Sequence, residues 1–131
     1  MRRRPAPQPV LLATMGPVAA HTARATFATN LLAAGGVPVT VAGPTGGVEA
    51  VLAAYSGEPV ACLAGTDAAY AEWGAELVAA LRAAGATYVV LAGKQEVVDV
   101  AVDDSAATGV DALAFLARVR TALGVTEEED A

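Results

Sequence analysis

One histidine stands where a strand is expected to give way to a helix. The stretch LLATMGPVAAHTARATFATNLLAAGG (11–36) starts with a β-type run, turns at Met15-Gly16-Pro17, and carries the chain's one histidine, His21, at the start of a helix-like run. In an open α/β sheet, ligands bind at such strand-to-helix turns. An imidazole there can coordinate a metal that a cofactor carries. It can also cap or pack against the turn, which on spacing alone is the more common role.

The other residue types that carry chemistry form no complete site. The single cysteine, Cys62, lies in the apolar run PVACLAG (59–65), which predicts a core thiol rather than an exposed nucleophile. One histidine and one cysteine are too few for a zinc site, so no metal is expected. Four aspartates could gather at one end of the sheet: Asp99, Asp103, Asp104 and Asp111. Such a set is more often a solvated loop plus a helix cap.

Several function classes lack their motifs. Neither GxGxxG nor GxxxxGK[ST] occurs, so dinucleotide and nucleoside triphosphate binding are not expected. The first strand ends in Thr14-Met15-Gly16 without the carboxylates of a phosphoacceptor domain. Ser56 and Ser105 both lack the GxSxG elbow of a serine nucleophile. No catalytic residue is therefore predicted.

Composition limits the compartment and the partners. The net charge is −6 and the basic cluster Arg2–Arg4 is short, so no nucleic-acid partner is expected. No apolar run approaches the ~18 residues of a membrane span. A single thiol suits a reducing compartment, which predicts a cytoplasmic protein. With 131 residues, 55% of them hydrophobic, we expect a Pro- and Arg-rich lead-in over 1–9, one α/β domain over 10–124 and an acidic tail over 125–131.

Within that domain, short apolar runs alternate with helical patterns. Strands are expected over 10–15, 37–42, 59–65 and 87–93. Helices are expected from residue 21 or 22 to 34, within 44–57, over 68–85 after a cap at Asp67, and over 109–124. The predicted apolar stripes of the first and last helices are Phe27, Leu31 and Ala34, and Leu113, Leu116, Val119 and Leu123.

The segment VVDVAVDD (97–104) alternates as an edge strand does. Too few residues separate it from the preceding strand for a crossover helix. Either the connection is irregular or the segment is a loop that crosses the end of the sheet.

The alternation predicts a doubly wound, mostly parallel sheet of the flavodoxin-like kind, three layers thick, with strand order 2-1-3-4-5. Its ligand crevice would lie at the carboxyl ends of the first and third strands, lined by the turns 16–22, 65–67 and 93–94. The candidate ligand-contacting residues are Gly16, His21, Thr22, Gly65, Thr66 and Gly93.

Three stretches resemble a known family. GPVAAHTARATFATNLLAAGG, ACLAGTDAAYAEWGAELVAALRAAGATYVVLAGK and GVDALAFLARV are similar to the C-terminal domain of the methylmalonyl-CoA mutase small (β) subunit. The resemblance covers about 10–123 and implies the cobalamin-binding type of flavodoxin-like fold. It does not cover the long N-terminal barrel half that this subunit usually carries.

The catalytic large subunit of that family binds adenosylcobalamin through a DxHxxG turn, an SxL turn and a GG turn. Aligned by the helices, these motifs fall on positions where only Gly93 is retained. The replaced positions are Val18, Ala20, Ala23, Ala64 and Ala92. His21 lies one residue beyond the cobalt-ligand position, which turns a helical side chain by about 100°.

The resemblance thus implies a non-catalytic, degenerate cobalamin-type domain, with no cofactor expected, that serves subunit association in an enzyme interconverting methylmalonyl-CoA and succinyl-CoA. Its expected partner is the mutase large subunit or a separate barrel subunit, with a homo-oligomer as a further option. The alternative is a carrier that binds cobalamin, with His21 on the cobalt, and supplies it to a barrel subunit. A third, weaker option is a stand-alone sensor of a small molecule that uses the same crevice.

Overall fold

Five parallel strands form the centre of the fold. The structure is a computed structural model that describes residues 9–93, 102–106 and 111–123. The strands β1 (Val10–Thr14), β2 (Val39–Val41), β3 (Val60–Ala64), β4 (Tyr88–Ala92) and β5 (Asp104–Ala106) lie in the order β2-β1-β3-β4-β5. Every neighbouring pair is parallel. The predicted flavodoxin-like sheet with order 2-1-3-4-5 is therefore confirmed; the acidic tail lies outside the described residues.

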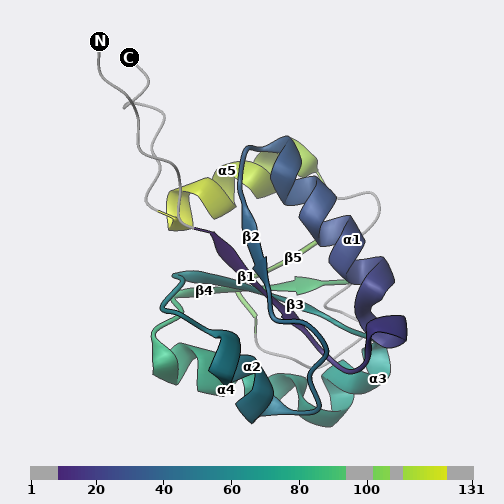
Figure 1. Cartoon of the computed structure of the whole chain (residues 1–131). Helices are drawn as coiled ribbons and strands as arrows, with labels where there is room; N and C mark the ends of the chain where they lie inside the picture. The colour runs from purple at the N-terminus through teal and green to yellow at the C-terminus, as the bar shows by residue number, and fades with distance from the viewer. Residues whose placement is uncertain (1–8, 94–101, 107–110, 124–131) are drawn as a thin grey trace.

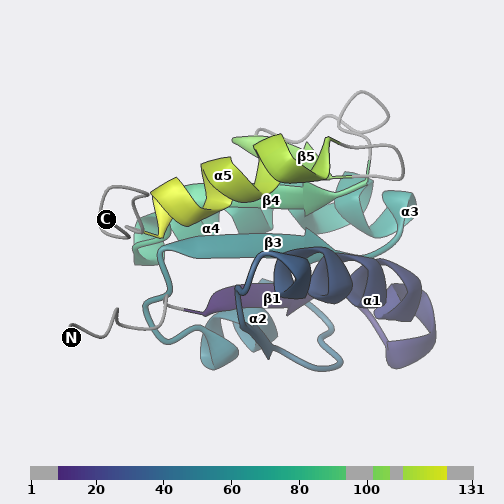
Figure 2. The same cartoon turned by 90° about the horizontal axis from the view of Figure 1, so that it is seen from above.

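Helices cover both faces of the sheet (Figure 1). One face carries α1 (Val18–Ala34) and α5 (Ala112–Ala122), which lie side by side across the strands (Figure 2). The other face carries α2 (Val48–Ala54) and a continuous helix made of α3 (Asp67–Ala69), the π-helical η1 (Tyr70–Gly74) and α4 (Ala75–Ala84). Successive strand residues point to opposite faces, so β1 and β3 contribute to both apolar cores and are fully buried.

The helix α1 begins about a turn earlier than the sequence predicts. Gly16, at φ +85°, turns the chain out of β1, and Pro17 occupies the N-cap before the helix-forming alanines. The expectation of a start at residue 21 or 22 is therefore wrong, and His21 lies inside the first turn rather than ahead of it. Phe27 and Leu31 pack against the core as expected, but Ala34 is exposed.

The last helix buries a different stripe from the predicted one. Leu116, Val119 and Leu123 are buried as expected, but Leu113 is 82% exposed and Phe115 is in the core. Leu113 and Phe115 are two residues apart, which places them about 200° apart around a helix. Asp111 caps this helix, since its Oδ1 accepts a hydrogen bond from the Ala114 amide at 3.2 Å.

The fifth strand lies later in the chain than the alternating valines suggest. β5 begins at Asp104, and Val102 packs against the core from outside any strand. Of the segment 97–104, the described residues place only Asp104 in a strand, while residues 97–101 lie outside the described residues. Two ion pairs hold this edge: Arg82 to Asp103 at 3.0 Å and Arg118 to Asp104 at 2.7 Å.

Candidate functional site

The predicted site residues lie at the carboxyl edge of the sheet. Gly16 follows β1, Gly65 and Thr66 follow β3, and Gly93 follows β4. His21 and Thr22 are in the first turns of α1. The strand-to-helix turns therefore meet where the sequence places the crevice, and the side chains that fill it decide what it can bind.

His21 is turned into the protein. Its side chain is buried, and Nδ1 lies 3.1 Å from the carbonyl oxygen of Gly16. A carbonyl oxygen can only accept, so Nδ1 carries the proton and the ring is fastened to the turn that precedes its own helix. The neighbouring Thr22 is exposed, and its hydroxyl donates to the carbonyl oxygen of Val18 at 2.5 Å. Both side chains are thus engaged with the helix α1 and its entry turn.

The loop after β2 is fastened over the end of β1. The Thr14 hydroxyl donates a hydrogen bond to the carbonyl oxygen of Gly43 at 2.5 Å. The Thr45 hydroxyl donates to the carbonyl oxygen of Thr14 at 2.6 Å. The amide of Gly16 donates to the carbonyl oxygen of Thr45 at 2.8 Å. Thr14 and Thr45 are both buried. These bonds close the β1–β2 side of the edge with the chain's own groups.

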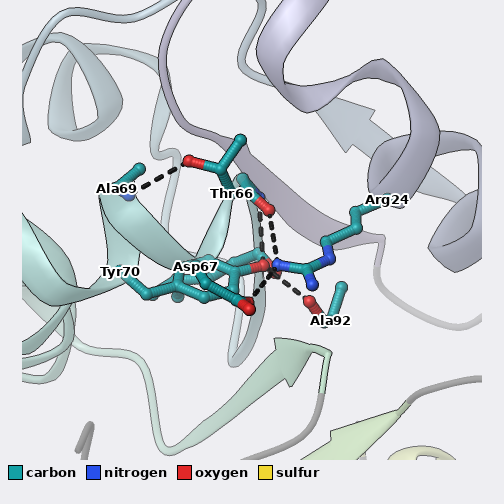
Figure 3. Close-up of polar contacts among 8 residues, drawn as sticks. Arg24, Thr66, Asp67, Ala69, Tyr70 and Ala92 are labelled. Atoms are coloured by element: carbon teal, nitrogen blue, oxygen red, sulfur yellow. Dashed lines mark hydrogen bonds and ion pairs between the residues drawn. The ribbon is translucent and has the colours of Figure 1, made fainter. Parts of the chain in front are cut away.

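The β3–β4 side is taken up by Arg24 (Figure 3). This arginine extends from α1, and Nη1 donates to the carbonyl oxygen of Gly65 at 2.9 Å while lying 2.8 Å from Oδ1 of Asp67. The guanidinium carbon is 5.4 Å from the centre of the Tyr70 ring, a cation–π distance. A Cβ placed on Gly93 would lie 3.4 Å from that carbon. Arg24 therefore reaches both predicted glycine turns.

The charge on Arg24 is stabilised by its neighbours. Partial burial alone would lower the pKa of the guanidinium, but the hydrogen bond to Asp67 and the nearby Tyr70 outweigh it and leave the pKa raised. Arg24 and Asp67 are 33% and 49% exposed, so their ion pair is partly screened by solvent. The pair acts as a positional contact between α1 and the turn after β3.

Tyr70 binds the ends of two strands beneath that arginine. Its hydroxyl accepts a hydrogen bond from the Gly65 amide at 3.0 Å and donates to the carbonyl oxygen of Ala92 at 2.6 Å (Figure 3). The carbonyl oxygen of Leu63 is a second acceptor, 3.1 Å from the same hydroxyl. Burial raises the pKa of the phenol to about 12, so it stays protonated at neutral pH. Gly65 itself has no room for a side chain, because a Cβ there would lie 2.9 Å from that of Met15.

The cap of the helix that carries Tyr70 differs from the expected one. We expected Asp67 at the N-cap, but Thr66 holds that position and accepts from the Ala69 amide at 3.1 Å. Asp67 is the first helical residue, where a carboxylate favours the helix dipole. Its carboxylate is thereby free to pair with Arg24.

The remaining candidates are structural. Cys62 is buried, and burial raises the pKa of its thiol to about 12, so it is no nucleophile. Asp111 forms the helix cap expected for this set of aspartates. Asp103 and Asp104 do not form the expected solvated loop, because they pair with Arg82 and Arg118 and Asp104 belongs to β5. Asp99 lies outside the described residues. Across 9–93, 102–106 and 111–123, no group of three His, Cys, Asp or Glu could hold a metal ion, and no helix could span a membrane.

Sequence reasoning missed Arg24 and Tyr70 as members of this edge. A usable signal was present: Arg24 is three residues after His21, on the same side of a helix, and TDAAY (66–70) places a carboxylate and a phenol directly after the third strand. Arg24, near the first turn of the expected crevice, and Asp67, at the second, carry opposite charges. Such a pair predicts an ion pair that crosses the crevice.

Comparison with known proteins gives relatives of one kind. No family model matches the chain. The chain is 46% identical over 121 residues to the methylmalonyl-CoA mutase small subunit of Streptomyces virginiae, covering 88% of this chain and 19% of that protein. It is 46% identical over 89 residues to the probable methylmalonyl-CoA mutase small subunit of Mycobacterium bovis, covering 66% of this chain and 14% of that protein. The chain spans less than a fifth of the length of these relatives. Over most of its own length, it is therefore a homologue of one segment of the methylmalonyl-CoA mutase small subunit.

Proposed function

We propose that this domain is a non-catalytic, degenerate copy of a cobalamin-binding domain that serves subunit association in a methylmalonyl-CoA mutase. The observation that carries the proposal is the bridge of Arg24, Asp67 and Tyr70 across the β3–β4 edge. In a flavodoxin-like sheet the ligand crevice lies at the carboxyl ends of β1 and β3. Arg24 crosses this place, from α1 after β1 to the carbonyl oxygen of Gly65 after β3. Here the space between the two glycine turns holds the protein's own side chains.

The residues of the edge do not fit a corrin and its nucleotide tail. A cobalt ligand needs an imidazole directed outward, whereas His21 is buried and bonded to Gly16. Gly65 and Gly93 are the small residues that could admit a nucleotide tail. The space beside Gly65 is taken by Met15, and the space beside Gly93 is taken by Arg24. We therefore assign no cofactor and no catalytic step to this domain.

The carrier alternative keeps one supporting observation. Since Nδ1 of His21 faces the Gly16 carbonyl, Nε2 is the ring nitrogen left to bind a metal. To use it, the first turn of α1 would have to open and expose a ring that is 5% exposed. The filled crevice favours the association role over this one.

The association role predicts a partner, namely the large subunit of a mutase. The test is size-exclusion chromatography and calorimetry of the purified chain with a mutase large subunit whose own cobalamin site is intact. A defined complex, with no change in the cobalamin content of the large subunit, is the expected result. No complex at tens of micromolar of each protein would contradict the proposal.

A further inference from the structure

A groove lies on the face of the sheet that α2 and α4 cover. It runs between the start of α2 and the η1–α4 helix and has a volume of about 630 Å³. Figure 1 shows α2 beside this helix, and the figure's labels place both on the face opposite α1 and α5. The groove is lined by Gly46, Gly47, Val48, Glu49, Ala50, Glu72, Trp73 and Glu76.

The groove is acidic. Glu49, Glu72 and Glu76 are all exposed, and no lysine, arginine or histidine is among the lining residues. The ion pairs of the described residues use Asp67, Asp103 and Asp104, so these three glutamates are not neutralised by them. Three like charges around one groove repel each other, and a cationic group brought in from outside relieves that repulsion.

Trp73 gives the groove an aromatic wall. The ring is partly buried against the core beneath α2 and α4, and it also lines the groove. Guanidinium and ammonium groups bind best over the face of an indole, and tryptophan and arginine are frequent anchors of protein interfaces. An indole between carboxylates is thus suited to a basic side chain.

The π-helical segment sets the direction of this wall. Within Tyr70–Gly74, Tyr70 binds the strand ends at the crevice, while Trp73 lines the groove. The wider turn changes the helical register between Tyr70 and the buried Leu77 and Leu81. Such π segments are uncommon and often occur at functional sites.

We propose that this groove docks a basic segment of a partner protein, with an arginine or lysine side chain on Trp73 and its charge paired by Glu49, Glu72 and Glu76. The proposal rests on the association role above and names the surface that performs it. The occupant is defined by charge complementarity: a cationic, extended segment meets an acidic groove of about 630 Å³ with an aromatic wall.

The test uses Trp73 as its own reporter, because the chain has a single tryptophan. The probe is acetyl-Arg-Arg-Arg-amide, with the uncharged citrulline peptide as control, titrated at near-physiological salt while tryptophan emission is followed. We expect a saturable change with the arginine peptide alone. A triple variant, Glu49→Gln, Glu72→Gln and Glu76→Gln, is expected to bind at least tenfold more weakly.

A second triple variant controls for charge alone. Glu127→Gln, Glu128→Gln and Glu129→Gln remove the same formal charge from the acidic tail and are expected to change the affinity less than twofold. Equal losses in the two variants would overturn the proposal, because the peptide would then respond only to net charge. A truncated chain that begins at Pro9 and lacks Arg2–Arg4 is compared with the full chain in the absence of peptide. A different tryptophan emission in the truncated chain would also overturn the proposal, since the chain's own Arg2–Arg4 would then be the occupant of the groove.

The same variants separate this inference from the proposed function. If the groove variant associates with a mutase large subunit as tightly as the unmodified chain, the docking surface is wrong while the association role stands. If the unmodified chain does not associate, the association role fails, and the peptide titration still decides whether the groove binds basic segments.

Discussion

At the scale of single residues, one guanidinium and one phenol determine the character of the carboxyl edge. Arg24 brings a positive charge from α1 to the carbonyl of Gly65, and Tyr70 occupies the main-chain groups of β3 and β4 beneath it. Main-chain donors and acceptors at strand ends are the groups that a ligand would otherwise use. The crevice is therefore occupied from within.

Removal of the Tyr70 hydroxyl tests this arrangement. Tyr70→Phe leaves the Gly65 amide and the Ala92 carbonyl without their partner in a buried place, so the free energy of unfolding is expected to fall by about 1–3 kcal/mol. Urea denaturation measures it. The matched control is Tyr55→Phe, which should cost less, because the half-buried Tyr55 hydroxyl donates a single bond, to the carbonyl oxygen of Glu58. Equal costs would show that the strand-end bonds have no special weight.

Buried acids predict an alkaline limit to stability. Burial raises the pKa of Cys62 from 9.0 to about 12 and that of Tyr70 from 10.0 to about 12. A folded pKa above the unfolded one means that the stabilisation is complete below pH ~9 and is lost as the pH rises toward 12. Between pH 8 and 10.5 the unfolding free energy should fall by about 2 kcal/mol through Cys62.

The control for that pH dependence is Cys62→Ala, measured by urea denaturation at the same pH values. Its unfolding free energy should decline less steeply than that of the unmodified chain, because Tyr70 still titrates. Parallel curves for the two proteins would contradict the assignment to the thiol.

At the scale of elements, β5 is fastened by polar contacts of Asp104 as well as by the buried Ala106. Asp104 accepts from Arg118 at 2.7 Å and from the Tyr88 hydroxyl at 2.8 Å. Burial alone would raise the pKa of Asp104, but the hydrogen bonds from Arg118 and Tyr88 outweigh it and hold the pKa below its usual value of 3.8. Its stabilising effect is thus present above that value and is lost as the pH falls through the lowered pKa.

Asp104→Asn is therefore expected to loosen the sheet edge. The free energy of unfolding should fall by about 1 kcal/mol, since the ion pair is only partly buried. Relative to the unmodified chain, hydrogen exchange should become faster at the amides of β5 and change less at those of β3. Hydrogen–deuterium exchange with mass spectrometry measures this locally. Asp111→Asn is the control, because asparagine is an equally good N-cap. Unchanged exchange in β5 after Asp104→Asn would contradict the role of the ion pair.

The last helix tests the assignment of its buried face. Phe115→Ala should lower the unfolding free energy by about 3–5 kcal/mol, since the ring is 2% exposed in the core. Leu113→Ala, at 82% exposure, should change it by less than about 0.5 kcal/mol. Thermal or urea denaturation compares the two. A large cost at Leu113 would restore the stripe that the sequence spacing suggested.

The elements show which parts of the fold the sequence could reveal. The fully buried strands β1 and β3 are continuous apolar runs, so their places follow from composition and periodicity. β5 carries Asp104 and Ser105 and is short, so its propensity is weak and side chains distant in sequence determine it. In the crevice, the turns could be predicted, and the charges of Arg24 and Asp67 signal a bridge. Its contacts could not be predicted, because they join α1 to residues some forty positions later.

At the scale of the whole molecule, the sheet and its cores are those of a ligand-binding α/β fold, while the edge is closed. The lining of the proposed docking groove does not include Arg24, Asp67 or Tyr70, so a partner bound there would not have to displace the bridge. The proposed association role is therefore compatible with a closed crevice.

The most direct measurement is a titration of the purified chain with hydroxocobalamin and adenosylcobalamin, followed by the corrin absorption spectrum. His21→Ala is titrated beside it. With the crevice filled by Arg24 and Tyr70, no spectral change is expected up to high micromolar cobalamin in either protein. A saturable shift to the base-off form with histidine on the cobalt, abolished by His21→Ala, would contradict this account and make the domain a cofactor carrier.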